Sequence, residues 1–148
     1  MVEVDIHNIE EILKHQIQIH KIKKICVSLS GGVDSIVLLN ALNKISYKDC
    51  SIRAIHINHN LVKDSQSWAN FCKKLCDQTK VQIDIYSVNV NPKGGFGIEA
   101  AARKARYHKL LRSIQEGEWL MTAHHQDDQL ETILLRMARG TGVEGLQG

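Results

Sequence analysis

The chain has 148 residues, the size of one domain, and 43% of them are hydrophobic, which allows a packed core and excludes an intrinsically disordered chain. Nineteen basic and sixteen acidic side chains give a formal charge of +3, which excludes the strongly basic balance of a nucleic-acid coat protein. No apolar run approaches the roughly 20 residues that span a bilayer, and the N-terminus lacks the pattern of a signal peptide, so we expect a cytoplasmic protein without a membrane partner.

Helical and strand-like segments alternate along the chain. Helices are expected over residues 6–19, 35–42, 98–113 and 127–138 and after Asp64, and strands over 24–29, 51–57, 81–88 and 118–122. This alternation predicts an α/β fold, a doubly wound parallel sheet with helices on both faces. Ligands bind such sheets beyond the carboxyl ends of the strands. We therefore expect the chemistry at residues 30–35, 56–61, 90–97 and 123–128.

The loop after the first strand, Ser28-Leu29-Ser30-Gly31-Gly32-Val33-Asp34-Ser35, has the composition of an anion-binding loop. Two glycines let backbone N–H groups approach a bulky anion, and the following helix adds a positive end. Ser30 and Ser35 supply hydroxyl groups. The lysine of a Walker loop is missing, which disfavours a Walker-type NTPase. The alternative is a Gly-Gly turn with a serine cap.

The segment SGGVDS in this position resembles the pyrophosphate-binding loop of the N-type ATP pyrophosphatases, the PP-loop superfamily. Members cleave ATP to AMP and pyrophosphate and adenylate a carbonyl oxygen, which a nitrogen or sulfur nucleophile then attacks. The resemblance implies that ATP is bound by Ser30, Gly31, Gly32, Val33, Asp34 and Ser35. A carboxylate beside phosphates calls for an intervening cation, so we assign Asp34 as a ligand of Mg²⁺.

Histidines follow the second strand in the segment His56-Ile57-Asn58-His59. This spacing suits a transition metal, but histidines that bind loop backbone or line a nucleotide pocket are the favoured interpretation. We assign His56 to nucleotide binding. Cys72 and Cys76 share one face of the helix expected after Asp64, and because no CxxC pair is present we favour core packing over a metal site. That helix is expected to bury Trp68, Phe71, Cys72 and Leu75.

The helix over 98–113 carries a basic cluster. Arg103, Arg106 and Tyr107 fall within one turn on one face, and residues 93–112 hold six basic side chains against one acidic. A solvated basic face is the ordinary explanation of such charge. The functional alternative is a patch for a phosphate-rich partner, to which arginine can make bidentate contacts.

Acidic residues follow the fourth strand in the segment AHHQDDQLET. Stabilisation of a helix N-terminus explains one or two of Asp127, Asp128 and Glu131. It does not explain the two preceding histidines as well. Ligation of Mg²⁺, with Asp128 as a candidate ligand, and capture of a cationic nucleophile account better for the cluster.

Taken together, residues 25–148 resemble the N-terminal catalytic domain of the tRNA(Ile)-lysidine synthetase family, with an adenine nucleotide alpha hydrolase-like, Rossmann-type fold. The resemblance depends on SGGVDS, HINHNL, EAAARKARY and above all AHHQDDQLETILLRMARGTGVEGLQG. It implies one PP-loop catalytic domain over residues 1–148, followed in the family by further tRNA-binding domains. Related tRNA thiolases carry a CxxC pair, which is absent here.

The family resemblance implies ATP-dependent ligation of L-lysine to C2 of the wobble cytidine of tRNA(Ile) with a CAU anticodon. The lysidine formed through an adenylated cytidine changes the codon specificity from AUG to AUA. Asp34, Arg103, Arg106, Asp127, Asp128 and Glu131 are the catalytic candidates. The alternatives are a metal-dependent phosphohydrolase that uses the His/Asp cluster, another PP-loop tRNA-modifying enzyme, and a nucleotide-binding module like the universal stress proteins.

Overall fold

The computed structural model describes residues 6–45, 49–61, 63–90, 97–126 and 129–136, and for residues 6, 7 and 124–136 the backbone only. The elements, in chain order, are α1 (Ile6–Ile19), β1 (Lys24–Ser28), α2 (Val33–Lys44), β2 (Ser51–Asn58), α3 (Ser65–Thr79), β3 (Gln82–Ser87), α4 (Gly97–Ser113), β4 (Glu118–Gln126) and β5 (Gln129–Arg136). None of the helices in these segments is both long and apolar enough to cross a bilayer.

Five strands form one sheet in the order β3-β2-β1-β4-β5. Strands β1 to β4 are parallel, and only β5 runs antiparallel, against β4. The chain moves outward from β1 to β3 and then crosses back to β4 on the other side of β1. This crossover reverses the winding direction, which is the topology that opens a ligand-binding crevice at the carboxyl ends of the strands.

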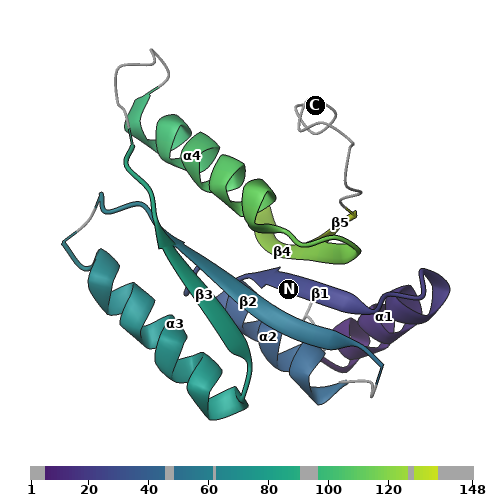
Figure 1. Ribbon diagram of the computed structural model, residues 1–148. Helices are drawn as coiled ribbons and strands as arrows, with labels where there is room; N and C mark the ends of the chain where they lie inside the picture. Colours follow the sequence, from purple (N-terminus) through teal and green to yellow (C-terminus); the bar gives the residue numbers. More distant parts are fainter. Residues whose placement is uncertain (1–5, 46–48, 62, 91–96, 127–128, 137–148) are drawn as a thin grey trace.

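Helices cover both faces of the sheet, which confirms the predicted doubly wound α/β architecture (Figure 1). On one face α1, α2 and α3 enclose a core that includes Leu13, Val27 and Leu39. On the opposite face α4 packs over a smaller cluster with Cys26, Ile55 and Leu110. Side chains of β1 alternate between these two cores because successive residues of a strand point to opposite faces.

Two predictions from the sequence are wrong in the part of the chain that the structure describes. The helix expected over 127–138 is replaced by β5, which pairs Gln129 with Gln126 and Arg136 with Trp119 along the free edge of β4. A short apolar run suits helix and strand equally, and the edge of β4 supplies the hydrogen-bond partners that decide for the strand.

The second wrong prediction concerns α3. Cys72 is fully buried as expected, but Trp68 is 49% exposed and Phe71 46% exposed. Helix α3 instead turns Ala69, Cys72 and Cys76 toward the sheet. The small residues bring the helix close to β2 and β3, and this leaves the two large aromatic side chains at the edge of the contact.

Candidate functional site

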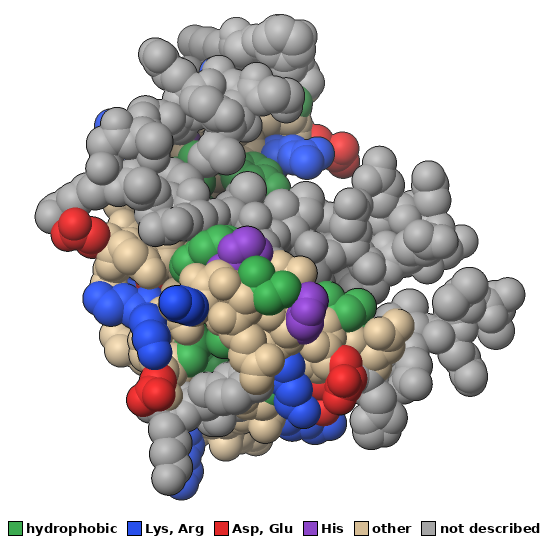
Figure 2. Space-filling model, turned by 90° about the vertical axis from the view of Figure 1, so that its right-hand side faces the viewer, with side chains coloured by type: hydrophobic (Ala, Val, Ile, Leu, Met, Phe, Trp, Pro, Cys, Tyr) green, Lys and Arg blue, Asp and Glu red, His purple; other side chains and the backbone are tan. Residues whose placement is uncertain are grey.

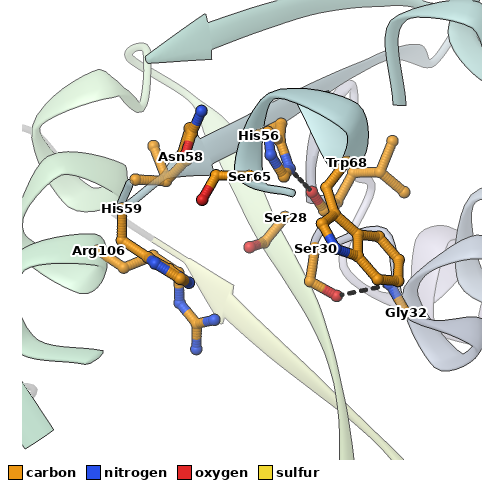
Figure 3. A pocket seen from close by; sticks show the side chains of 11 residues that line it. Ser28, Ser30, Gly32, His56, Asn58, His59, Ser65, Trp68 and Arg106 are labelled. Carbon is orange, nitrogen blue, oxygen red and sulfur yellow. Dashed lines mark hydrogen bonds between the residues drawn. The ribbon is translucent and has the colours of Figure 1, made fainter. Parts of the chain in front are cut away.

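A cavity of about 220 Å³ lies at the carboxyl ends of β1 and β2, where the topology predicts a ligand site. In Figure 3, Arg106 and His59 stand on one side of it and Trp68 and Gly32 on the other. The labelled lining residues are Ser28, Ser30, Gly32, His56, Asn58, His59, Ser65, Trp68 and Arg106.

The loop between β1 and α2 is held by its own serine side chains. The Ser35 hydroxyl donates to the carbonyl of Gly32 at 2.9 Å and accepts from the Ser30 N–H at 3.2 Å. Because Ser35 has only one hydroxyl proton, Ser30 is the donor in the 3.1 Å contact between the two hydroxyl oxygens. Ser30 Oγ accepts in turn from the N–H of Gly32. The two serines therefore shape the loop, and direct contact with a ligand stays a prediction.

The N-terminus of α2 faces this loop without a side-chain cap. Its N-cap residue is Gly32, which has no side chain to bind the first N–H groups of the helix. These N–H groups and the helix dipole form a positive region that suits an anion. Asp34, half-buried in the first turn, adds a carboxylate at the same place. An anion that binds here together with a hard cation satisfies both features.

His56 is a buried histidine that reaches from β2 to the start of the loop. Its Nδ1 lies 2.7 Å from the carbonyl oxygen of Leu29, and since a carbonyl only accepts, Nδ1 carries the proton. Burial lowers the pKa of His56 below 6.5, and the hydrogen bond to Leu29 offsets this only in part. The ring is therefore neutral near pH 7, with Nε2 free of a proton. The backbone contact of the favoured interpretation is confirmed, and His56 also lines the cavity; that this cavity binds a nucleotide stays a prediction.

The lowered pKa of His56 makes the stability of the domain depend on pH. The unfolded chain binds a proton at His56 near pH 6.5, whereas the folded chain does so only at lower pH, so the free energy of unfolding falls as the pH drops below about 6.5. We expect His56→Asn, which keeps a donor for Leu29 but cannot titrate, to reduce this loss.

Urea unfolding between about pH 7.5 and pH 5.5 measures the pH dependence directly. The control is His108→Asn, which removes an exposed histidine on α4. Equal pH slopes for wild type and His56→Asn would contradict the assignment.

The turn after β2 brings Asn58 and His59 to the cavity. Asn58 is 4% exposed, and its Oδ1 accepts from the N–H of Asn60, whose φ of 55° lies in the left-handed region. Asparagine tolerates this conformation, and the side chain of Asn58 closes the turn. Asn58 and Ser65 were not expected from the sequence to line a site, whereas His59 belongs to the histidines expected to bind loop backbone or line a nucleotide pocket, and its Nδ1 accepts from the N–H of Leu61 at 3.4 Å. A polar residue at the carboxyl end of a strand, where ligands bind such sheets, is the signal that could have identified Asn58.

The basic cluster of α4 divides between the cavity and the exposed surface. Arg106 is half-buried and lines the cavity, whereas Arg103 is exposed. Both guanidinium groups lie 5.9 Å from the centre of the Tyr107 ring, within the range of a cation–π contact, as their shared helical face predicts. Tyr107 thus lies beside both arginines. Of the two, Arg106 is the one that can meet a ligand in the cavity.

Cys72 and Cys76 belong to the core, as predicted. Both are fully buried, and burial raises the pKa of each thiol to about 11, so neither is a thiolate at neutral pH. Among the described side chains no group of three His, Cys, Asp or Glu residues is arranged to hold a metal ion. Asp127 and Asp128 lie outside the described residues, and Glu131 lies in β5, where only the backbone is described.

The fold and this site define a class: a Rossmann-type α/β domain with a glycine loop and an uncapped helix N-terminus beside a cavity at the strand ends. The family model of the PP-loop domain matches residues 3–148. The chain therefore belongs to the PP-loop family, whose members use ATP.

Curated relatives share the same domain. The chain is 48% identical over 122 residues to a tRNA(Ile)-lysidine synthase of Hydrogenovibrio crunogenus, with 82% of this chain and 29% of that protein covered. It is 41% identical over 140 residues to the protein of the same name in Alkalilimnicola ehrlichii, with coverages of 94% and 32%. The chain thus spans about a third of the length of the curated relatives that it matches.

Two solved structures share the fold. A U34-tRNA thiolase, NcsA, from Methanococcus maripaludis matches with a TM-score of 0.52 and 19% identity over 68% of this chain and 40% of its own. An NH3-dependent NAD synthetase from Campylobacter jejuni subsp. jejuni matches with a TM-score of 0.57 and 12% identity over 79% and 56%. At these low sequence identities the likeness concerns the fold alone, and it confirms the predicted adenine nucleotide alpha hydrolase-like class.

Proposed function

We propose that this chain is the catalytic domain of a cytoplasmic tRNA(Ile)-lysidine synthase. The reaction joins L-lysine to C2 of the wobble cytidine of tRNA(Ile) with a CAU anticodon, at the expense of ATP. The observation that carries the proposal is the identity of 41–48% to synthases of this name, together with an uncapped glycine loop at the predicted ATP site. The first half-reaction adenylates the cytidine, and the second replaces AMP by the lysine ε-amine.

The loop between β1 and α2 is assigned to the pyrophosphate part of ATP. The open N–H groups at the start of α2 can bind the phosphate oxygens, which carry most of the charge of the nucleotide. The serine network holds the loop in one shape before ATP arrives, so little ordering is required on binding. His56 supports the loop through Leu29 and presents Nε2 as an acceptor for a nucleotide hydroxyl or amino group.

The donor chemistry of Asp34 fits Mg²⁺. Carboxylate oxygens are its usual protein ligands, one or two per ion, with phosphate oxygens completing the shell. Asp34 stands in the first turn of α2 beside the loop, so its carboxylate would hold the ion, with Asp128 as the second candidate. When bound, Mg²⁺ neutralises charge on the leaving pyrophosphate.

Arg106 is proposed to stabilise the charge that develops on the transferring phosphate, and Arg103 to contact the RNA backbone. We expect Arg106→Ala to slow single-turnover adenylation of tRNA about 100-fold, because it removes a fixed positive charge from the cavity. Arg103→Ala, its matched control on the exposed side, should instead raise the KM for tRNA several-fold at an almost unchanged rate. The same loss of rate in both variants would contradict this division.

Asp127, Asp128 and Glu131 are proposed to receive lysine. A lysine ammonium has a reference pKa of about 10.4 and no lone pair for attack at neutral pH. A carboxylate can hold the ammonium and accept its proton as the amine attacks C2 of the adenylated cytidine. The support for this assignment is the sequence pattern of three acids in five residues.

One assay tests the proposed function. The full chain is incubated with radiolabelled lysine and a tRNA(Ile) transcript with a CAU anticodon, with and without ATP. We expect label in the tRNA only with ATP, and none in a transcript whose wobble cytidine is replaced by uridine. Phosphate release without lysine or tRNA would favour a phosphohydrolase, and ATP binding without incorporation would favour a regulatory module. Either result would overturn the proposal.

A further inference from the structure

Trp68 is a large aromatic side chain that the fold leaves half in water. It is 49% exposed, on the second turn of α3, and it lines the cavity. An indole with so much exposed apolar surface gives up much of the stabilisation that full burial would bring. Single exposed hydrophobic residues are common, so exposure alone assigns no role to Trp68. What Trp68 touches is more informative.

The indole lies directly against the glycine loop. A Cβ atom built on Gly31 would be 2.9 Å from Cε3 and 3.5 Å from Cζ3 of Trp68, and 3.5 Å from Sγ of Cys72. Gly31 also has a φ of +89°, in the region that side-chain-bearing residues rarely adopt. Helix α3 and the loop therefore meet with no space for a side chain between them. In Figure 3 the indole stands beside Ser30 and Gly32.

The loop is fixed on either side of Gly31 by hydrogen bonds. Leu29 is held by His56, and the two serines bind the backbone of Ser30 and Gly32. At Gly31 itself the contact that we find is packing against α3. Glycine reaches both signs of φ with similar ease, so this residue needs an external constraint to keep one conformation.

We propose that Trp68 is a positioning residue, which holds Gly31 in the conformation that lets the loop bind pyrophosphate. The inference rests on the proposed role of this loop. A loop that also adopts other conformations binds its ligand more weakly. Its apparent affinity is the intrinsic affinity multiplied by the fraction of molecules in the binding-competent conformation. Removing the indole frees Gly31, while the serine network and the core under α3 stay in place.

The test compares Trp68→Ala with Phe71→Ala in the full chain. Phe71 is a matched control, because it lies three residues further along α3 and is 46% exposed, and it does not line the cavity. Titration calorimetry with inorganic pyrophosphate and Mg²⁺ is the measurement. We expect about tenfold weaker binding for Trp68→Ala and less than a twofold change for Phe71→Ala, with similar thermal unfolding of both variants. Trp68→Phe, which keeps a ring, should recover part of the affinity.

A double-mutant cycle tests for direct contact. Gly31→Ala introduces both a collision with the indole and backbone strain, and only the collision depends on Trp68. We therefore expect Gly31→Ala to weaken pyrophosphate binding by a smaller factor in the Trp68→Ala background than in wild type. Equal factors would overturn the inference.

Three other outcomes would also overturn it, and they are distinguishable. Wild-type affinity for pyrophosphate in Trp68→Ala, with weaker binding of ATP alone, would mean that the indole contacts the base. Unchanged binding of both ligands would leave the loop assignment standing without Trp68. If wild type itself bound no pyrophosphate, the proposed function of the loop would fail together with the inference.

Discussion

Asp34→Asn should abolish adenylation, with a loss of at least about 100-fold in the exchange of labelled pyrophosphate into ATP in the presence of tRNA. The substitution keeps the shape of the side chain and removes the negative charge that would hold Mg²⁺ at the start of α2. Without that ion, the backbone N–H groups of the loop and Arg106 would have to neutralise more of the charge on the departing pyrophosphate.

The matched control for this experiment is Asp64→Asn. Asp64 is the N-cap residue of α3, its side chain makes no capping hydrogen bond, and it does not line the cavity. Its exchange rate should equal that of wild type. Normal exchange in Asp34→Asn would contradict the assignment of Asp34 as a ligand of Mg²⁺. This conclusion does not depend on the roles of Asp127, Asp128 and Glu131.

Arg53→Met should lower the free energy of unfolding by about 3–5 kcal/mol, the usual cost of breaking a buried ion pair. The Arg53 side chain is 10% exposed, and its guanidinium binds Glu118 through two hydrogen bonds of 2.6 and 2.8 Å. It also binds Asp84 and the carbonyl of Ser113, each at 2.8 Å. These hydrogen bonds, chiefly those to Glu118, raise the pKa of Arg53, so its charge is permanent. Its loss leaves Glu118 buried and without this partner.

Two further variants make the prediction specific. Lys73→Met removes an exposed ion pair with Asp77 on α3 and should cost less than about 1 kcal/mol. The double variant Arg53→Met/Glu118→Leu should recover part of the lost stability, because no unpaired charge remains at the centre of the network. Urea unfolding measures all three, and a loss below about 1 kcal/mol for Arg53→Met would contradict the structure.

The network around Arg53 also matters for the site. Ser113 is the last residue of α4, and its carbonyl ties the end of this helix to β2 and β4. Helix α4 also carries Arg106. The network of Arg53 therefore holds the C-terminal end of the helix that brings Arg106 to the cavity at the opposite end of the sheet. The surface seen in Figure 2, from the side of α1, has acidic and basic side chains interspersed among its described residues. This face therefore has mixed charge, whereas residues 93–112 hold six basic side chains against one acidic.

Much of the fold was predictable because it depends on local patterns. The opening helix was expected over 6–19 from the spacing of Ile6, Ile9, Leu13 and Ile17, and Leu13 and Ile17 are indeed buried. Strands β1 to β3 are short runs that contain isoleucine or valine, and β4 is a short run that includes Trp119, Leu120 and Met121, so the order of these strands along the chain was also predictable. The strand over 129–136 was not predictable, because a short apolar segment can form either a helix or a strand. It forms a strand because the edge of β4 supplies hydrogen-bond partners.

The sequence by itself determined which residue types follow each strand, and hence that a glycine loop, histidines and an arginine-rich helix would serve one end of a parallel sheet. Chain order and chirality suffice for that, since parallel strands all end at the same edge. Only the tertiary structure decided that Arg106 rather than Arg103 reaches the cavity. It also decided that Trp68 lies outside the core and packs on Gly31. These outcomes depend on how closely α3 and α4 approach the sheet. Small buried residues set the distance for α3, and the hydrogen bonds of Arg53 to Glu118 and to the end of α4 set it for α4. Both kinds of contact join residues that are far apart in the sequence.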